Sequence, residues 1–327
     1  TIGTVTADAA SSGTGNASAT AITFYPGEID FKVGTSAGQI SFAARGGSTG
    51  GNGGGLFING YGSAVTVYGA GAMSSPLDVT APGATGNGGQ IYLTAYNGLT
   101  FDGSASLLTA NAGTSSGNGG KIKIQTSINP IVIDSGSSGN VKLSAKASGD
   151  GDGGTVDILS YAGITANPSQ IDVSAGTDGT GGWITLNAYY STLTLNGNLN
   201  ANGGTGNGKG GKIELQGAFI DLPAMSNTSI TANGNGSGKG GKVEILSPYD
   251  TITIGSANGQ MSIQARNTDT GDGGEIKVVG SNDVQISGGS LDVGAGNGGD
   301  GGKITAEATS GTLTLSGNLS AKGGGSG

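Results

Sequence analysis

Aspartates within glycine-rich stretches are the residues of this sequence best suited to binding a metal ion. They are Asp150, Asp152, Asp272 and Asp300. Calcium takes six or more oxygen ligands, and calcium-binding solenoids repeat their acidic motif in successive turns. Lys209 and Lys239 occupy the equivalent position in two other stretches. We therefore expect no cofactor, and a calcium site around Asp150 and Asp152 stays open as the alternative to solvated turn residues.

Three aromatic side chains fall on outward positions of predicted strands. They are Phe57, Tyr92 and Trp183. Exposed aromatic rings bind sugars or pack against a neighbouring molecule. Pairing of the rings across adjacent strands is the alternative that needs no ligand. We expect these residues to form either a lateral contact face or a ligand face.

Threonines recur with alternating spacing in another set of predicted strands. Three pairs read Thr-x-Thr, namely Thr192 with Thr194, Thr251 with Thr253, and Thr312 with Thr314. A flat and regular threonine array orders water and is typical of ice binding. Threonine is also simply a favourable exposed strand residue. Val132 and Gln285 interrupt the column, so ice binding is an alternative and not the first interpretation.

The residues that most often carry catalysis are scarce. The chain has no histidine and no cysteine, which removes the commonest general base, disulfides and cysteine-ligated metals. Its arginines are Arg45 and Arg266, and no GxxxxGK[ST] phosphate loop occurs. We expect no enzyme. A polysaccharide-degrading enzyme is the less favoured alternative, and it would need carboxylates that converge on one cleft.

Charge and hydropathy restrict the partners. The formal net charge of −8 argues against nucleic acid, because phosphate binding needs clustered lysine and arginine. No run of 18 apolar residues occurs, which argues against membrane insertion. No signal peptide is visible and the sequence begins at Thr1, so we expect a processed product or an internal fragment.

The elements that position these residues follow from an internal repeat. A Gly-Gly pair followed by alternating apolar residues recurs nine times, with a mean spacing of about 31 residues. The pairs begin at Gly53, Gly88, Gly119, Gly153, Gly181, Gly210, Gly240, Gly273 and Gly301. Such regularity in a chain with 71 glycines indicates an ordered repeat and not a disordered glycine-rich segment.

Each repeat carries three short segments that alternate between apolar and polar residues. In the repeat that opens at Gly181, the inward pairs are Ile184 with Leu186, Leu193 with Leu195, and Leu199 with Ala201. In the next repeat the second segment is assigned Phe219 and Leu222 as its inward residues. Period-two alternation bounded by glycine and asparagine predicts strands, and glycine permits positive φ in the loops.

The predicted fold is an all-β, single-domain parallel β-helix, or β-solenoid. It has about ten coils of about 31 residues, with three short strands each. Residues 1–52 are expected to form a divergent first coil with Val5, Ile22, Phe31 and Phe42 inward, and residues 53–327 the regular coils. Stacking would give a rod about 50 Å long, since neighbouring strands lie about 4.8 Å apart.

The glycine- and asparagine-rich repeats resemble those of the filamentous-haemagglutinin-like large bacterial exoproteins and related surface proteins. The similar stretches are Gly86–Ile91, Gly117–Ile122 and Thr314–Leu319. The resemblance covers the whole chain as a style of repeat. It implies a right-handed β-helix, an extracellular or cell-surface location on a bacterium, and a role in adhesion or fibre formation. The resemblance implies no catalytic residues in the shaft.

We therefore expect an extracellular structural or adhesive solenoid, acting as the shaft or as a fibre-forming segment of a bacterial surface protein. The expected partners are further copies or a longer array of the same repeats, because open strand edges invite pairing, and cell-surface glycans. A glycan- or ice-binding module that uses an exposed threonine or aromatic wall is the alternative function.

Overall fold

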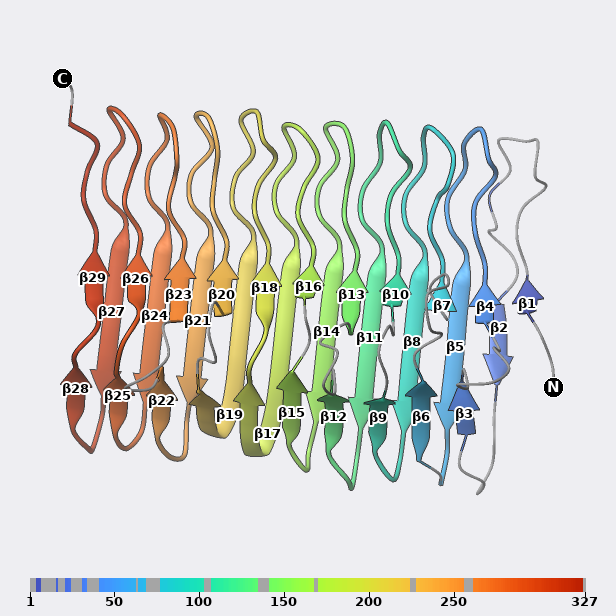
Figure 1. The fold of residues 1–327 in the computed structure, drawn as a ribbon, viewed down its shortest axis with the longest axis horizontal. Coiled ribbons are helices and arrows are strands. Elements are labelled where there is room, and N and C mark those ends of the chain that lie inside the picture. The colour runs from blue at the N-terminus through green and yellow to red at the C-terminus, as the bar shows by residue number, and fades with distance from the viewer. Residues whose placement is uncertain are drawn as a thin grey trace.

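The computed structural model describes residues 4–6, 16, 21–24, 31–33, 41–62, 64–68, 77–102, 107–134, 141–167, 170–223, 228–255 and 261–325. These residues form 29 strands and no helix. Each coil passes through three strands, which we call the first, second and third walls in chain order. Figure 1 shows the coils stacked side by side along one axis.

The strands of each wall are spaced one coil apart in the chain. The first wall holds β2 (Ala21–Phe24), β5 (Gly55–Gly60), β8 (Gln90–Ala95), β11 (Lys121–Thr126), β14 (Thr155–Ser160), β17 (Trp183–Leu195), β19 (Lys212–Leu222), β21 (Lys242–Ser247), β24 (Glu275–Gly280) and β27 (Lys303–Ala308). The second wall holds β3 (Phe31–Val33), β6 (Val65–Tyr68), β9 (Leu99–Asp102), β12 (Ile131–Asp134), β15 (Ile164–Asn167), the second halves of β17 and β19, β22 (Ile252–Ile254), β25 (Val284–Ile286) and β28 (Leu313–Leu315).

The third wall is a separate sheet of eleven strands. It holds β1 (Thr4–Thr6), β4 (Ser41–Ala43), β7 (Leu77–Asp78), β10 (Leu107–Thr109), β13 (Lys142–Ser144), β16 (Gln170–Asp172), β18 (Asn198–Asn200), β20 (Thr228–Thr231), β23 (Met261–Gln264), β26 (Ser290–Asp292) and β29 (Asn318–Ser320). The first and second walls together form one 18-stranded sheet, because β17 and β19 run through both.

Neighbouring coils pair in parallel and residue for residue. In the first wall, for example, Ile122 lies between Ile91 and Val156. The prediction of an all-β parallel solenoid is confirmed, and the expected number of about ten coils agrees with the eleven strands of the third wall.

The core follows from the alternation in each strand. In β11 the residues alternate between partly exposed and buried, with Ile122 and Ile124 fully inside. Ile133 and Leu143 close the same coil from the other two walls. The buried residues form one hydrophobic cluster that begins at Phe42. Burial of each such side chain contributes roughly 1.5–3 kcal/mol, so the stack of coils is the source of stability.

The divergent first coil joins the stack in the predicted frame. Ile22 pairs with Leu56, and Phe31 pairs with Val65. Val5 pairs with Phe42 in the third wall. The same alternation also predicts Ala7, Ile29 and Ile40 as inward residues of this coil, and these three lie outside the described residues.

The paired glycines form a neck where the two halves of each coil touch. The amide of Gly154 donates to the carbonyl of Ala145 at 2.8 Å. A Cβ on Gly154 would lie 2.1 Å from the carbonyl oxygen of Gly120 in the preceding coil. Positive φ occurs at loop glycines such as Gly117. Glycine is therefore required at the neck for close approach of backbones, while positive φ belongs to the loops.

The coil formed by β27, β28 and β29 lies at the open end of the stack. Its Leu313, Leu315 and Leu319 occupy the positions that are buried in earlier coils, yet they are 39%, 43% and 47% exposed. No described strand lies beyond this coil to cover them. Among the described residues, the edge of these three strands is uncovered and carries exposed leucines; Figure 1 shows the three strands at the end of the stack.

Candidate functional site

The aspartates of the glycine-rich stretches belong to one column of residues that precedes the neck. The amide of Thr180 donates to Asp152 Oδ1 at 2.7 Å, and the amide of Asp300 donates to Asp272 Oδ1 at 2.9 Å. These carboxylates therefore cap a backbone amide of the following coil. Asp150 lies two residues before Asp152 and is exposed.

Asparagines extend the same column toward the N-terminus. Asn52, Asn87 and Asn118 each accept the amide of the next coil through Oδ1, at 2.7 to 2.8 Å. Thr180, Lys209 and Lys239 fill the coils between Asp152 and Asp272. The acidic residues therefore do not form a continuous stack, and within the described ranges no group of three acidic or other metal-ligating side chains converges on one point.

A shallow groove of about 710 Å³ lies over the neck glycines near the C-terminal end. Its charged lining residues are Lys239, Lys242, Lys303, Asp272, Glu275 and Asp300. The structure thus brings Asp272 and Asp300 together with three lysines and leaves Asp150 and Asp152 several coils away. Alternating charges of both signs do not resemble a cation site.

The predicted aromatic residues occupy the first wall at outward positions. Phe57 and Tyr92 stack on one another, with ring centroids 5.1 Å apart and planes 13° apart. Lys121 Nζ lies 5.8 Å from the Tyr92 ring. Trp183 is 45% exposed, lies under Lys212 Nζ at 5.0 Å and donates to Glu214 Oε2 at 3.1 Å. Phe57 and Tyr92 therefore form a cross-strand pair, and Trp183 lies apart from them.

The predicted threonine pairs lie on the second wall, on every second coil. In the intervening coils Phe219 faces Thr192, and Asp221 lies between Thr194 and Thr253. In the next intervening coil, Gln285 lies between Thr253 and Thr314. Asp283 of that coil accepts the amide of Thr312 through Oδ1 at 2.7 Å. The pairs are thus separated by bulky or charged side chains.

Charged side chains of the first wall form a zigzag network. Lys212 and Lys242 are neighbours in register, as are Glu214 and Glu244. Glu244 offsets the repulsion between these like-charge neighbours, because both lysines contact its carboxylate. Lys212 Nζ of the neighbouring strand lies 3.3 Å from Glu244 Oε2, and Lys242 Nζ of the same strand lies 2.9 Å from Glu244 Oε1. Lys212 also pairs with Glu214, and Lys242 with Glu275 at 3.5 Å.

The network shifts the titration of its members. Burial by itself raises the pKa of Glu244, but hydrogen bonds from Lys242 and Lys212 outweigh burial and lower it below the usual value. For Lys212 burial lowers the pKa, while hydrogen bonds to Glu214 and Glu244 raise it by more. The network therefore stabilises the register of this wall.

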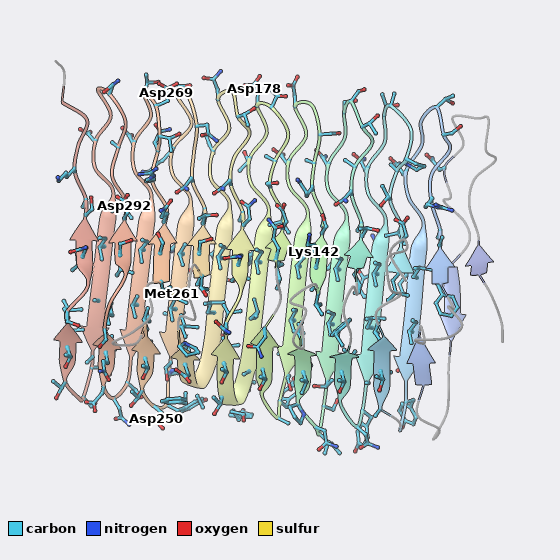
Figure 2. The ribbon with its side chains drawn as sticks, in the orientation of Figure 1. Lys142, Asp178, Asp250, Met261, Asp269 and Asp292 are labelled. Atoms are coloured by element: carbon cyan, nitrogen blue, oxygen red, sulfur yellow. The ribbon has the colours of Figure 1, made fainter. Side chains whose placement is uncertain are left out.

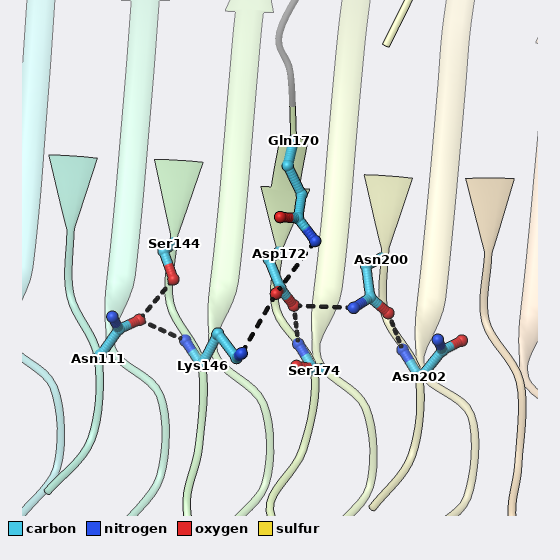
Figure 3. Close-up of polar contacts among 8 residues, drawn as sticks. All are labelled: Asn111, Ser144, Lys146, Gln170, Asp172, Ser174, Asn200 and Asn202. Carbon is cyan, nitrogen blue, oxygen red and sulfur yellow. Dashed lines mark hydrogen bonds and ion pairs between the residues drawn. The ribbon is translucent and has the colours of Figure 1, made fainter. Parts of the chain in front are cut away.

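Polar side chains cover the third wall (Figure 3). Asp172 is 7% exposed and accepts the Ser174 amide at 3.0 Å and Asn200 Nδ2 at 3.1 Å through Oδ1. Its Oδ2 lies 3.5 Å from Lys146 Nζ. Asn111 joins the neighbouring coil by accepting Ser144 Oγ at 2.7 Å. Every polar contact here links adjacent coils or one turn, which indicates a structural role.

A row of exposed large side chains, all tyrosine except Ile128, lies at the turn between the first and second walls and is absent from the predicted site residues. We call this row the tyrosine corner. It consists of Tyr61, Tyr96, Ile128, Tyr161, Tyr189, Tyr190 and Tyr249, which are 38–78% exposed. The turns lie at the lower edge of the coils in Figure 1, and Figure 2 places Asp250, the neighbour of Tyr249, there. Six of the nine tyrosines of the chain are in this row.

The corner is built by a small inward residue followed by a turn. The first-wall strands end at small side chains such as Ala95 and Ser160, and the aromatic residue comes next. Gly98 and Gly163 then adopt φ of 112° and 125°, which lets the chain reverse into the second wall. A small residue followed directly by tyrosine was the sequence signal that could have identified this row.

A bulge exposes the centre of the row. The register shifts between Ala188 and Thr192, because Tyr189–Ser191 in one coil faces the single residue Ala218 in the next. The assignment of Phe219 to the core is therefore wrong. Ile220 is the buried residue, and Phe219 lies opposite Thr192.

Four rings of the corner lie in one continuous strip. Tyr161 lies 5.6 Å from Tyr189, Tyr189 lies 4.4 Å from Tyr190 in a T-shaped pair, and Tyr190 lies 6.1 Å from Tyr249. The charge of Tyr189 is the main factor that raises the pKa of Tyr190, with smaller effects from burial and other tyrosines. Tyr190 therefore keeps its hydroxyl proton to a higher pH than an isolated tyrosine would, because its pKa is raised.

No protein-family model matches this chain, and no curated protein matches it. The part of the chain that the structure describes contains no helix long and apolar enough to cross a bilayer. The fold and the surface geometry are thus the observations on which a function rests.

Proposed function

We propose that this chain is an extracellular shaft of a bacterial surface protein, of the kind found in filamentous-haemagglutinin-like exoproteins, with a structural and adhesive role. The observation that carries the proposal is the unbroken stack of parallel strands in the third wall, from β1 to β29. A solenoid in which each coil contacts its neighbours transmits force along its axis and displays the same surface at every coil.

The side chains support this role because they are used to join coils. Asparagine and aspartate cap amides in the next coil along the neck column. The Lys212, Lys242 and Glu244 network joins two adjacent coils of the first wall. Fibre formation by self-association is the related expectation, supported by the exposed Leu315 and Leu319 at the open end.

Electron microscopy of the purified chain tests the shaft. We expect straight particles about 50 Å long at low concentration, from coils about 4.8 Å apart. Ile158→Asp, which places a charge in the core, should abolish the particles, while the outward Thr94→Asp should retain them. Globular or irregular particles from the unchanged chain would contradict the proposal.

The surface location has its own test. An antibody raised against the purified rod should label intact cells of the source bacterium. Labelling only after the cells are opened would contradict an extracellular role while leaving the rod shape intact. Repeating the microscopy with added calcium and with a chelator shows whether the ion changes the length or assembly of the particles.

A further inference from the structure

The tyrosine corner is an exposed aromatic strip that the shaft itself does not require. Tyr190 and Tyr249 are 63% and 57% exposed, and their rings approach one another across the coil of Ala218. A less exposed arrangement exists in this fold, since Phe57 and Tyr92 stack on one another on the first wall and are only partly exposed. Large aromatic rings left in water at several coils along one edge indicate a ligand surface.

The corner is neutral over most of its length. The turns at residues 61–64, 96–98, 127–130, 161–163 and 189–192 contain no lysine, arginine, aspartate or glutamate. Farther along, Asp250 accepts Asn282 Nδ2 at 3.2 Å, and Asp283 accepts the amide of Thr312 at 2.7 Å. A polyanion would need clustered cations here, so the charge pattern favours an uncharged partner.

The strip is also linear and rigid. The turns that carry it follow one another along the solenoid axis, one per coil (Figure 1). Side chains hold neighbouring turns together, because Asn97 Nδ2 donates to the Gly62 carbonyl at 2.8 Å and Asn129 Nδ2 donates to the Asn97 carbonyl at 3.0 Å. The coil spacing of about 4.8 Å is close to the advance of one sugar residue in an extended glycan.

We propose that the tyrosine corner binds a neutral, linear polysaccharide that lies along the solenoid axis. The inference rests on the proposed function as a surface shaft and names what the shaft would adhere to. Tyr190 and Tyr249 supply ring faces for the C–H faces of sugar rings. Tyrosine hydroxyls and the corner amides of Asn97 and Asn129 donate to and accept from sugar hydroxyls.

Tyr189 positions the strip. Its ring meets Tyr190 edge to face at 87° and Tyr161 at 49°. This packing fixes the orientation of Tyr190 on the three-residue bulge. Little side-chain freedom is then lost on binding, which favours affinity.

Affinity electrophoresis of the full chain through gels that contain cellulose derivatives, β-1,3-glucan, mannan or xylan tests the proposal, with alginate as the acidic polymer. We expect retardation by at least one neutral polymer and none by alginate. The double variant Tyr190→Ala with Tyr249→Ala should weaken that retardation at least tenfold. Tyr190→Phe should retain it in large part, because the ring face is kept.

Leu319→Ala is the matched control, since Leu319 is 47% exposed but lies in the third wall, away from the corner. Equal loss in this control, unchanged retardation in the double variant, or no retardation by any neutral polymer would overturn the inference. If the double variant loses self-association but keeps polysaccharide binding, the corner is a contact between rods and the inference is overturned. Particles that remain straight in the microscope while polysaccharide binding fails would leave the shaft proposal standing.

Discussion

At the residue scale, side chains of one type have different roles at different coil positions. Asp152 and Asp272 cap backbone amides, whereas Asp221 lies on the second wall between two threonines. Burial raises the pKa of Asp221 because the ionised carboxylate loses water. The position of a residue in its coil therefore decides whether its charge stabilises the fold.

Asp221→Asn should stabilise the protein at neutral pH, by less than about 1 kcal/mol because water still screens part of the charge. The folded pKa of Asp221 is raised, so the ionised form costs stability above it. The gain should vanish as the pH falls and the wild-type carboxyl becomes protonated. Thermal unfolding at several pH values measures this, and Asp157→Asn, the register neighbour of Lys123, should show no gain.

Glu244→Gln should destabilise the protein by about 1 kcal/mol at neutral pH, because Lys212 and Lys242 lose their shared carboxylate. The folded pKa of Glu244 is lowered, so its contribution is present above the usual glutamate pKa and is lost as the pH falls through the folded value. Denaturant titrations should show the difference closing in acid. A similar loss in Glu307→Gln, an exposed glutamate, would refute the argument.

At the element scale, the neck decides the shape of every coil. The amide of Gly120 donates to the Ala110 carbonyl at 2.7 Å, and the bond recurs one coil later between Gly154 and Ala145. These hydrogen bonds join the end of the third-wall strand in one coil to the glycine pair that precedes the first-wall strand of the next coil. The neck, and not the loop beyond it, separates the apolar core from the glycine-rich stretch.

Gly154→Ala should cost about 3 kcal/mol or more, because the new Cβ would meet the Gly120 carbonyl at 2.1 Å and backbone must move. Gly323→Ala is the matched control, since its nearest neighbour would lie at an ordinary 3.5 Å. Thermal unfolding compares the two. Equal stability of both variants would mean that the neck glycines serve another purpose.

At the scale of the whole molecule, stability and association come from the same stacking. Coils inside the array bury their inward side chains completely, while Leu315 and Leu319 remain 43% and 47% exposed at the open end. Another coil placed there would extend all three walls and bury these residues.

Leu315→Ser with Leu319→Ser should therefore reduce self-association of this chain at least tenfold, with little change in its unfolding midpoint. Sedimentation velocity over a range of concentrations measures the assembly. Trp183→Ser removes an exposed apolar side chain away from the end and should leave assembly unchanged. Equal assembly by the unchanged chain, the double serine variant and Trp183→Ser would show that the open edge is not the contact.

The sequence by itself determined the period, the three strands of each coil and the inward residues, because alternation directly reports which side chains leave water. Even in the divergent coil, which lacks the Gly-Gly pair, Ile22 and Phe31 pair in the predicted register with Leu56 and Val65, and Phe42 is buried. Only the tertiary structure decided how residues from separate coils meet. Turn length controls that contact, as the bulge at Tyr189–Ser191 shows by displacing Phe219 from the core and exposing Tyr190. The tyrosine corner depends on such turns, whereas the strands depend on local alternation, and this is why the fold could be predicted and the corner could not.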